Sequence, residues 1–80
     1  MWIRTQDKKE LVNVNRVFIN KIFGDKNNNA AIWGEFKRNS IFSENKILLG
    51  RYTTIDDAIK EIDEIQKCIT ENSNNAYQMR

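Results

Sequence analysis

The sequence has no histidine, no proline and a single cysteine, and it has only three glycines in 80 residues. The absence of histidine removes the commonest general base and the commonest metal ligand, and with them the usual Ser-His and Cys-His nucleophile pairs. One cysteine cannot form an internal disulfide or a cysteine-based zinc site. Neither a Gly-x-x-x-x-Gly-Lys-Ser/Thr loop nor a Gly-x-Gly-x-x-Gly turn occurs. We therefore expect a protein that is not an enzyme and that uses neither a metal nor a cofactor.

Long hydrophobic runs are also absent. The longest, such as residues 17–19 and 47–49, are far shorter than the roughly 20 residues that a membrane-spanning helix requires. The first ten residues have neither the apolar core nor the small-residue cleavage site of a signal peptide. We therefore expect no membrane helix and a cytoplasmic location.

The length fits one domain, residues 1–80, divided into a sheet part (1–52), a helix (53–71) and a tail (72–80). A chain this short buries only about 60% of the surface of its unfolded state, so we expect a thin core. With 40% hydrophobic and 30% charged residues, the composition is that of a folded protein.

The clearest pattern is an amphipathic helix after residue 53. Thr54 followed by Asp57 is a variant of the capping box, and Thr53 is the alternative N-cap. The lone Cys68 lies beside the apolar positions and is interpreted as a small core residue. Apolar residues recur at the three- and four-residue spacing of one helix face: Ile55, Ala58, Ile59, Ile62, Ile65 and Ile69. This spacing places Ile59 and Ile62 at the centre of the buried stripe.

Before the helix, residue alternation predicts strands. The apolar parity changes within residues 11–23, which predicts a bulge or kink near Asn15 and Arg16. The Gly, Asp and Asn residues of 24–29 predict a hairpin loop. The expected extended segments are 2–6, 11–23, 30–37, 41–42 and 46–52, and the tail at 76–79 is expected to return as a short strand or to dock. For residues 30–37 the alternation does not decide which face is buried.

We therefore predict an α+β fold, in which an antiparallel β-meander of four or five strands carries one C-terminal amphipathic helix packed on one face. Parallel pairing is not expected, because the chain has no crossover helices between the strands.

The charge is unevenly distributed. Residues 1–52 carry ten Lys or Arg and five Asp or Glu, whereas residues 53–80 carry three and six. Asp57, Glu61 and Glu64 share one flank of the helix, and we interpret them as solvent-exposed charges. A basic sheet half is a possible surface for an anionic partner, although ordinary solvated charge explains it too.

Aromatic residues and cations are interleaved most densely in residues 33–38. This pattern is typical of proteins that stack bases and contact phosphates, and it suits a small anionic ligand equally well. The candidate binding residues in the basic half are Arg16, Trp33, Lys37 and Arg38.

The chain resembles small uncharacterised proteins of Gram-positive bacteria and their phages. The residues that carry this resemblance are Ile3-Arg4-Thr5-Gln6-Asp7-Lys8-Lys9 with Leu11, Leu49-Gly50-x-Tyr52, Ala58, Glu64-Ile65 and Tyr77-x-Met79. Those proteins usually have Tyr at the position of Trp2 and Pro at the position of Arg80. The resemblance implies a phage or mobile-element setting, in which small proteins often bind and block a host factor. It adds Arg4 and Gln6 as candidate contacts, for which a structural bond to a neighbouring turn is the alternative.

These observations predict a non-catalytic binding module that inhibits or sequesters a host protein or a small anionic ligand. The alternative is a nucleic-acid-binding accessory protein that uses the basic sheet half. We also expect a homodimer, because one helix cannot cover Trp2, Phe18, Trp33, Phe36 and Phe42 together. The alternative is a monomer in which the tail at 77–79 and the segment 41–42 cover that face of the sheet.

Overall fold

The computed structural model describes residues 1–37, 45–71 and 75–80. Residues Arg38, Ile41 and Phe42, for which a turn and a short strand were expected, lie outside these ranges. The described elements are β1 (Trp2–Arg4), β2 (Leu11–Asn13), β3 (Arg16–Lys21), β4 (Ala30–Glu35), β5 (Lys46–Tyr52), α1 (Ile55–Thr70) and β6 (Tyr77–Gln78). The predicted α+β class is confirmed.

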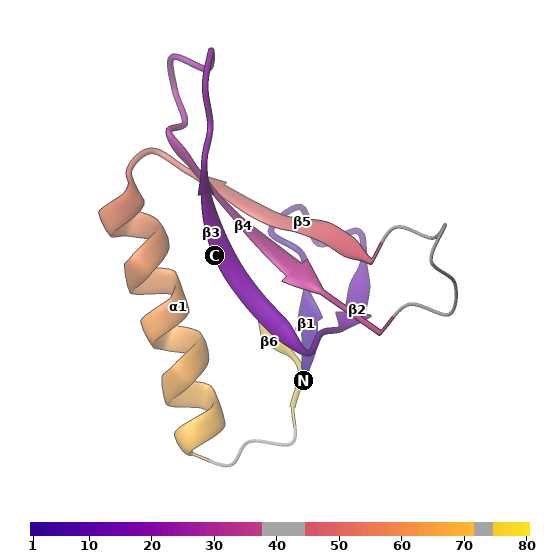
Figure 1. The fold of residues 1–80 in the computed structure, drawn as a ribbon. Helices are drawn as coiled ribbons and strands as arrows, with labels where there is room; N and C mark the ends of the chain where they lie inside the picture. The colour runs from indigo at the N-terminus through magenta and orange to yellow at the C-terminus, as the bar shows by residue number, and fades with distance from the viewer. Residues whose placement is uncertain (38–44, 72–74) are drawn as a thin grey trace.

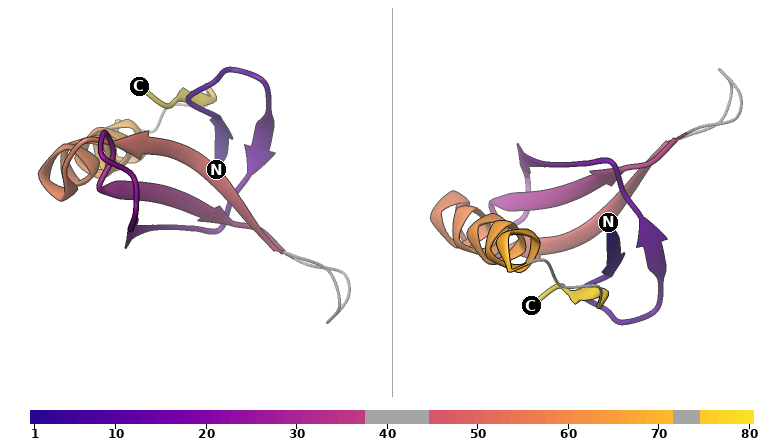
Figure 2. Two further views of the ribbon diagram at one scale, coloured as in Figure 1. Left: turned by 90° about the horizontal axis from the view of Figure 1, so that it is seen from above. Right: turned by 90° about the horizontal axis from the view of Figure 1, so that it is seen from below.

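The strands form two three-stranded sheets, with the orders β2-β1-β6 and β3-β4-β5. β1, β2 and β6 lie behind the β3-β4-β5 sheet in Figure 1, and the two views of Figure 2 separate the two groups. The prediction of one meander of four or five strands is therefore wrong in strand number and in arrangement. The exclusion of parallel pairing is also wrong, because the tail returns beside β1 and pairs parallel to it through Ile3 and Tyr77.

The two sheets separate where the sequence predicted a kink. β2 ends at Asn13, and the next two residues bond to different sheets. Val14 N–H donates to the Met1 carbonyl (2.8 Å), whereas Asn15 N–H donates to the Glu35 carbonyl (2.7 Å). The change in apolar parity therefore marks the point at which the chain passes from one sheet to the other.

α1 begins at the predicted cap. The Thr54 hydroxyl accepts a hydrogen bond from Asp57 N–H (3.0 Å), and Asp56 and Asp57 lie in the positively polarised first turn. Lys67 lies in the last turn, where a cation is favourable. The helix contacts β3, β4 and β5, so it covers one side of that sheet as predicted. No described helix has the length and apolar character that a bilayer span requires.

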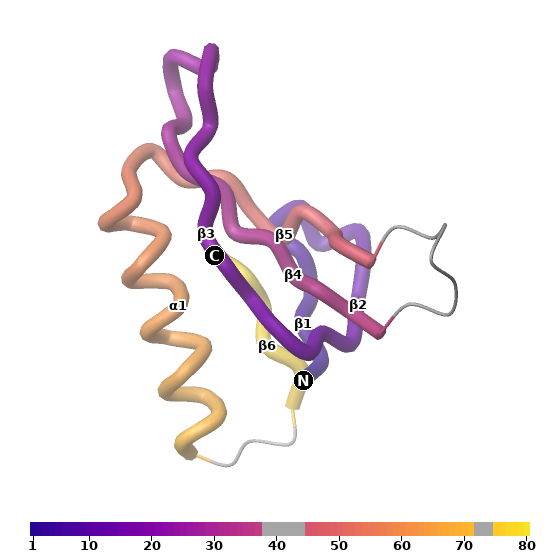
Figure 3. Tube along the Cα trace, in the orientation of Figure 1, coloured from indigo at the N-terminus to yellow at the C-terminus, as the bar shows by residue number. Residues whose placement is uncertain are grey.

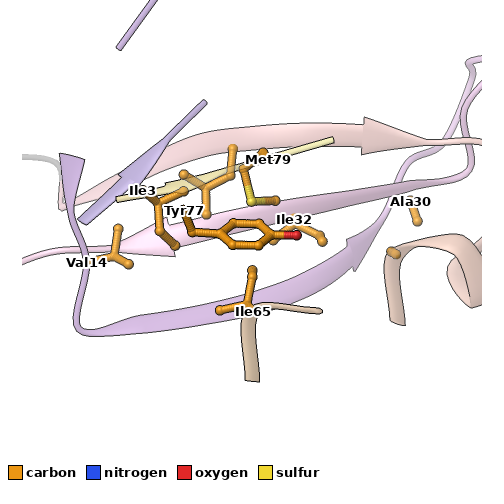
Figure 4. Close-up of a cluster of buried hydrophobic side chains, with 9 residues drawn as sticks. Ile3, Val14, Ala30, Ile32, Ile65, Tyr77 and Met79 are labelled. Atoms are coloured by element: carbon orange, nitrogen blue, oxygen red, sulfur yellow. The ribbon is translucent and has the colours of Figure 1, made fainter. Parts of the chain in front are cut away.

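The core lies between the two sheets and α1, as Figure 4 shows. Gly34 permits close packing there, because a Cβ at this position would lie 2.7 Å from a methyl of Val14. The buried apolar side chains come from both sheets, the helix and the tail: Ile3, Val14, Ala30, Ile32, Leu49, Ala58, Ile65, Tyr77 and Met79.

The buried face of α1 differs from the predicted one. Ile59 is 44% exposed, whereas Glu61 is only 5% exposed and Ile62 is partly buried. The stripe is therefore centred on Ala58, Glu61 and Ile65. The reason is that the returning tail packs against this side of the helix and offers hydrogen-bond donors to the Glu61 carboxylate, which makes its burial tolerable. The prediction that Ile59 is central and that Glu61 is solvent-exposed is wrong.

The loop at residues 24–29 is confirmed as the connection of the β3–β4 hairpin. Gly24 adopts φ +82°, and the Asp25 carboxylate accepts hydrogen bonds from the backbone N–H groups of Asn27 and Asn28. These bonds, the one from Asn27 most strongly, lower the pKa of Asp25. This connection projects beyond the rest of the chain at the top of Figure 3.

Candidate binding surface

The β3-β4-β5 sheet has one face toward the core and one face away from it. Val17, Ile19, Ala30, Ile32 and Ile47 belong to the core or pack against it. Because side chains alternate along a strand, their neighbours point the other way. In β5 the register shifts by one residue between the partners of Trp33 and Ile32, so Arg51 lies on the same side as Leu48. We call this opposite side of the sheet the outer face.

The strand register arranges the outer face in three rows that cross β3, β4 and β5. The first row carries charge, the second is apolar and the third is mixed. In the order β3, β4, β5, the rows are Arg16, Glu35 and Lys46; Phe18, Trp33 and Leu48; and Asn20, Ala31 and Arg51.

Two side chains of the charged row lie over the aromatic ring of Phe18 in the apolar row. Arg16 forms an ion pair with Glu35 (3.0 Å), and its guanidinium carbon lies 4.7 Å from the centre of the Phe18 ring. The Lys46 ammonium lies 5.5 Å from the same ring centre, on the side of β5. Two cations thus share one aromatic ring, a geometry in which each is attracted to the ring face. Both cations are exposed, so a partner can replace these contacts with its own.

The outer face carries three cations and one carboxylate, Glu35, around the half-buried row of aromatic and aliphatic side chains. The cations are Arg16, Lys46 and Arg51. Phe18, Trp33 and Leu48 are all absent from the core cluster. Aromatic residues and arginine are the types enriched where protein partners bind tightly. Chemically, the outer face can hold an anionic partner that also offers apolar area.

The structure brings together part of the candidate set predicted from the sequence. Arg16 and Trp33 lie in adjacent rows of the outer face. Lys37 is exposed two residues beyond the end of β4, and Arg38 lies outside the described residues.

Arg4 and Gln6 lie elsewhere. Arg4 is exposed on β1 in the other sheet. The Gln6 side chain donates to the carbonyls of Arg51 (3.1 Å) and Arg80 (2.9 Å) and accepts from Arg51 N–H (2.9 Å). Gln6 therefore joins the segment after β1 to β5 and to the C-terminal residue, so its bonds are structural but do not go to a neighbouring turn.

Sequence reasoning did not select Phe18, Leu48 and Lys46 as binding residues. The alternation along residues 16–20 and 46–48 puts Phe18 in phase with Arg16 and Leu48 in phase with Lys46. Only the strand register shows that Trp33 lies between Phe18 and Leu48.

A second group of charges lies where the tail meets α1. We call Glu61, Tyr77 and Arg80 the tail cluster. The Glu61 carboxylate accepts hydrogen bonds from the Tyr77 hydroxyl (3.0 Å) and from Arg80 N–H, and Arg80 also lies 3.8 Å from the Glu64 carboxylate. An adjoining pocket of about 390 Å³ is lined by Tyr52, Asp57, Lys60, Glu61, Asp63, Glu64 and Arg80. Both oxygens of Glu61 already accept hydrogen bonds from this chain, which makes the cluster a fastening for the tail.

Burial raises the pKa of both tyrosines in this region. For Tyr77 the hydrogen bond to the Glu61 carboxylate adds to the effect of burial, and for Tyr52 the Glu61 charge does so. The Tyr52 hydroxyl is buried without a hydrogen-bond partner among the described residues. Each phenol therefore keeps its proton to a higher pH than an exposed tyrosine does.

Within residues 1–37, 45–71 and 75–80, no group of three or more Asp, Glu or Cys side chains is placed to hold a metal ion. No protein-family model matches the chain, and neither a curated protein nor a solved structure is similar enough to count as a match.

Proposed function

We propose that the protein is a non-catalytic binding module that sequesters or inhibits a host protein through the outer face. The observation that carries this proposal is the apolar row Phe18, Trp33 and Leu48 beside the exposed cations Arg16 and Lys46. The setting implied by the resemblance, a phage or mobile element, fits a protein that acts by occupying its target.

The chemistry of the outer face favours a partner with an acidic surface. Arg16, Lys46 and Arg51 outnumber Glu35 among the nine positions of the three rows. Complementary charge of this kind speeds association and suppresses wrong partners, while the apolar row contributes most of the affinity. Binding should therefore weaken as salt is added without being abolished.

The proposal is tested by co-purification from cells of the bacterial host with the tagged full chain. Lys46→Glu and Trp33→Ala should lose a stoichiometric protein that the unmodified chain retains, because they reverse a charge and remove the central ring of the outer face. Lys60→Glu, a charge reversal at an exposed lysine on α1, is the matched control and should retain it. Equal capture by Lys46→Glu and Lys60→Glu would show that the outer face is not the binding surface.

Single-stranded nucleic acid is the second candidate, because cations stacked over Phe18 beside Trp33 are what sequence-independent strand binders use. In a Trp2→Phe chain, Trp33 is the remaining tryptophan, so its fluorescence reports on the outer face alone. Oligothymidylate should then quench it with an affinity that falls steeply with salt, by about 0.7 log unit per log unit of salt for each phosphate contacted. Inorganic phosphate and ATP, titrated in the same way, test the small-anion alternative. A flat response to all three leaves the protein partner as the supported class.

A homodimer through exposed aromatic residues is a competing proposal, because it would cover the row that the protein partner is proposed to bind. Trp2 is 53% exposed on β1, and the row with Phe18 and Trp33 faces away from the core. Light scattering at micromolar concentration tests it: a mass near 9.5 kDa means a monomer, whereas twice that mass, reduced by Trp33→Asp, supports the dimer.

A further inference from the structure

The β3–β4 connection carries the most exposed large apolar side chain among the described residues. Phe23 is 88% exposed, compared with 59% for Ile69 and 56% for Leu11. The connection extends away from both sheets and from α1 (Figures 1 and 3). A single exposed apolar residue is common on protein surfaces, so its exposure alone indicates nothing. Two further observations distinguish Phe23.

The first observation is that the loop is held in place. Ile22 N–H donates to the Asn29 carbonyl (2.9 Å), which continues the hairpin beyond β3. Asn29 N–H donates to the Tyr52 carbonyl (3.0 Å), which ties the other side of the loop to β5. Between them, the Asp25 carboxylate closes the turn. Phe23 is thus presented by an ordered hairpin, and binding through it costs little additional conformational entropy.

The second observation is the charge around the ring. Lys21 and Lys26 are exposed on either side of Phe23 in the chain. Arg51 lies close enough to Asp25 for its charge to contribute to the lowered pKa of that carboxyl. Asp25 itself is occupied by the backbone N–H groups of the turn. The surroundings of Phe23 are therefore net positive.

The tip also adjoins the outer face. Arg51 belongs to the third row of the outer face, opposite Ala31, and the next residue, Tyr52, accepts the hydrogen bond from Asn29 N–H of the connection. A partner that covers the outer face therefore meets the hairpin tip at the same end.

We propose that Phe23 is an anchor that the hairpin tip inserts into an apolar pocket with an acidic rim on the protein partner. This rests on the function proposed above and specifies the shape of the partner's surface. A bilayer is a poorer fit, because residues 24–29 are one glycine, Asp25, Lys26 and three asparagines, and one ring buries too little apolar area for stable anchoring. Nucleic acid is also a poorer fit, because Phe23 is the only aromatic residue in 21–29, whereas single-strand binders stack successive bases on several rings.

The test uses the full chain with the photo-reactive residue p-benzoylphenylalanine in place of Phe23, in cells of the bacterial host. We expect a cross-link to a protein, mapped to an apolar peptide with Asp or Glu nearby in its structure. The same residue in place of Leu11, which is exposed on the other sheet, should give no such product. A cross-link from position 23 to a second copy of this chain would overturn the proposal.

Affinity for the cross-linked protein provides the second measurement. Phe23→Ser should weaken binding by about tenfold or more, as the loss of a central aromatic anchor does. Lys26→Glu should weaken it by less, and added salt should remove that difference. Ile69→Ser is the control for loss of an exposed apolar residue and should change nothing.

The outcomes separate the two proposals. If Trp33→Ala and Lys46→Glu abolish binding but Phe23→Ser binds within twofold of the unmodified chain, the anchor is wrong and the outer face stands. If none of the three variants changes binding, both are wrong. Retention of the chain on phosphatidylglycerol vesicles or on oligothymidylate that is lost with Phe23→Ser would assign the tip to a membrane or to nucleic acid and overturn the protein anchor.

Discussion

The tail cluster and the outer face both place charge beside aromatic rings. They differ in whether the charged groups are buried with their hydrogen-bond partners inside this chain or exposed to a partner molecule. In the tail cluster, Glu61 is 5% exposed and both of its oxygens accept hydrogen bonds from Tyr77 and Arg80. On the outer face, the Arg16 side chain is 64% exposed and its ion pair with Glu35 lies at the surface. Buried charge of the first kind must be satisfied within the chain, whereas exposed charge of the second kind is free to exchange partners. We infer that the first holds the fold and the second is available for binding.

The largest effect on the free energy of unfolding is expected for a buried residue of α1. Ile65 is 3% exposed and Ile59 is 44% exposed on the same helix. Ile65→Ala should lower the free energy of unfolding by about 2–5 kcal/mol, because it leaves a cavity between the sheets and α1. Ile59→Ala should cost under about 1 kcal/mol. Urea denaturation measures both, and equal midpoints would mean that the helix is rotated from the orientation described here.

The next effect concerns Glu61 itself. Glu61→Ala leaves the Tyr77 hydroxyl and Arg80 N–H without their acceptor, at a cost of about 1–3 kcal/mol for each donor that stays buried. Asp63→Ala removes an exposed carboxylate two residues away and should leave the melting temperature nearly unchanged. If the two variants melt together, the tail cluster does not stabilise the fold.

The pH dependence of stability tests whether the Tyr77 hydroxyl is buried in the tail cluster. The pKa of Tyr77 is raised in the folded state, so the folded protein keeps the phenol proton at a pH where the unfolded chain releases it. The resulting stabilisation is complete below the ordinary tyrosine value near 10 and is lost progressively above it. Urea denaturation of the unmodified chain should therefore show falling stability above pH 10, and Tyr77→Phe should show a shallower fall. Identical slopes would contradict the assignment of a buried, hydrogen-bonded phenol.

The smallest effect on stability is expected on the outer face. Arg16→Ala removes an exposed ion pair and a contact with Phe18, which together should be worth about 1 kcal/mol or less. Its unfolding curve should nearly overlie that of the unmodified chain, while its capture of the partner falls. A destabilisation as large as that of Glu61→Ala would erase the distinction between the two regions.

Local sequence patterns were sufficient for the elements that depend on neighbouring residues. The Thr54 cap, the β5 strand, the Gly24–Asn29 loop and the break after Asn13 are all set by side chains within a few positions. Each of these could be predicted because capping, alternation and turn chemistry act locally.

Contacts between segments that are distant in the sequence determine the features that local patterns could not predict. The rotation of α1 depends on donors from Tyr77 and Arg80, which lie sixteen and nineteen residues after Glu61. Helix periodicity alone ranks an isoleucine above a glutamate for burial, so it selected Ile59. The parallel β1–β6 pair likewise joins the two ends of the chain.

The candidate binding surface could likewise be predicted only in part. The aromatic and basic stretch pointed to Trp33, but the alternation of residues 30–37 leaves two possible buried faces. Packing of Gly34 against Val14 and Leu49 settles this choice, because that side of β4 has no room for a larger residue. Only then do Phe18 and Lys46 join Trp33 on one surface.

Lysine footprinting of the captured complex shows whether the partner covers the outer face. Acetylation of the free chain and of the complex, followed by mass spectrometry, reports the accessibility of lysines on both sides of the molecule. Lys46 lies on the outer face, and Lys60 and Lys67 lie on α1. We expect the partner to protect Lys46 and to leave Lys60 and Lys67 as reactive as in the free chain. Protection of the two helix lysines with Lys46 unchanged would contradict it.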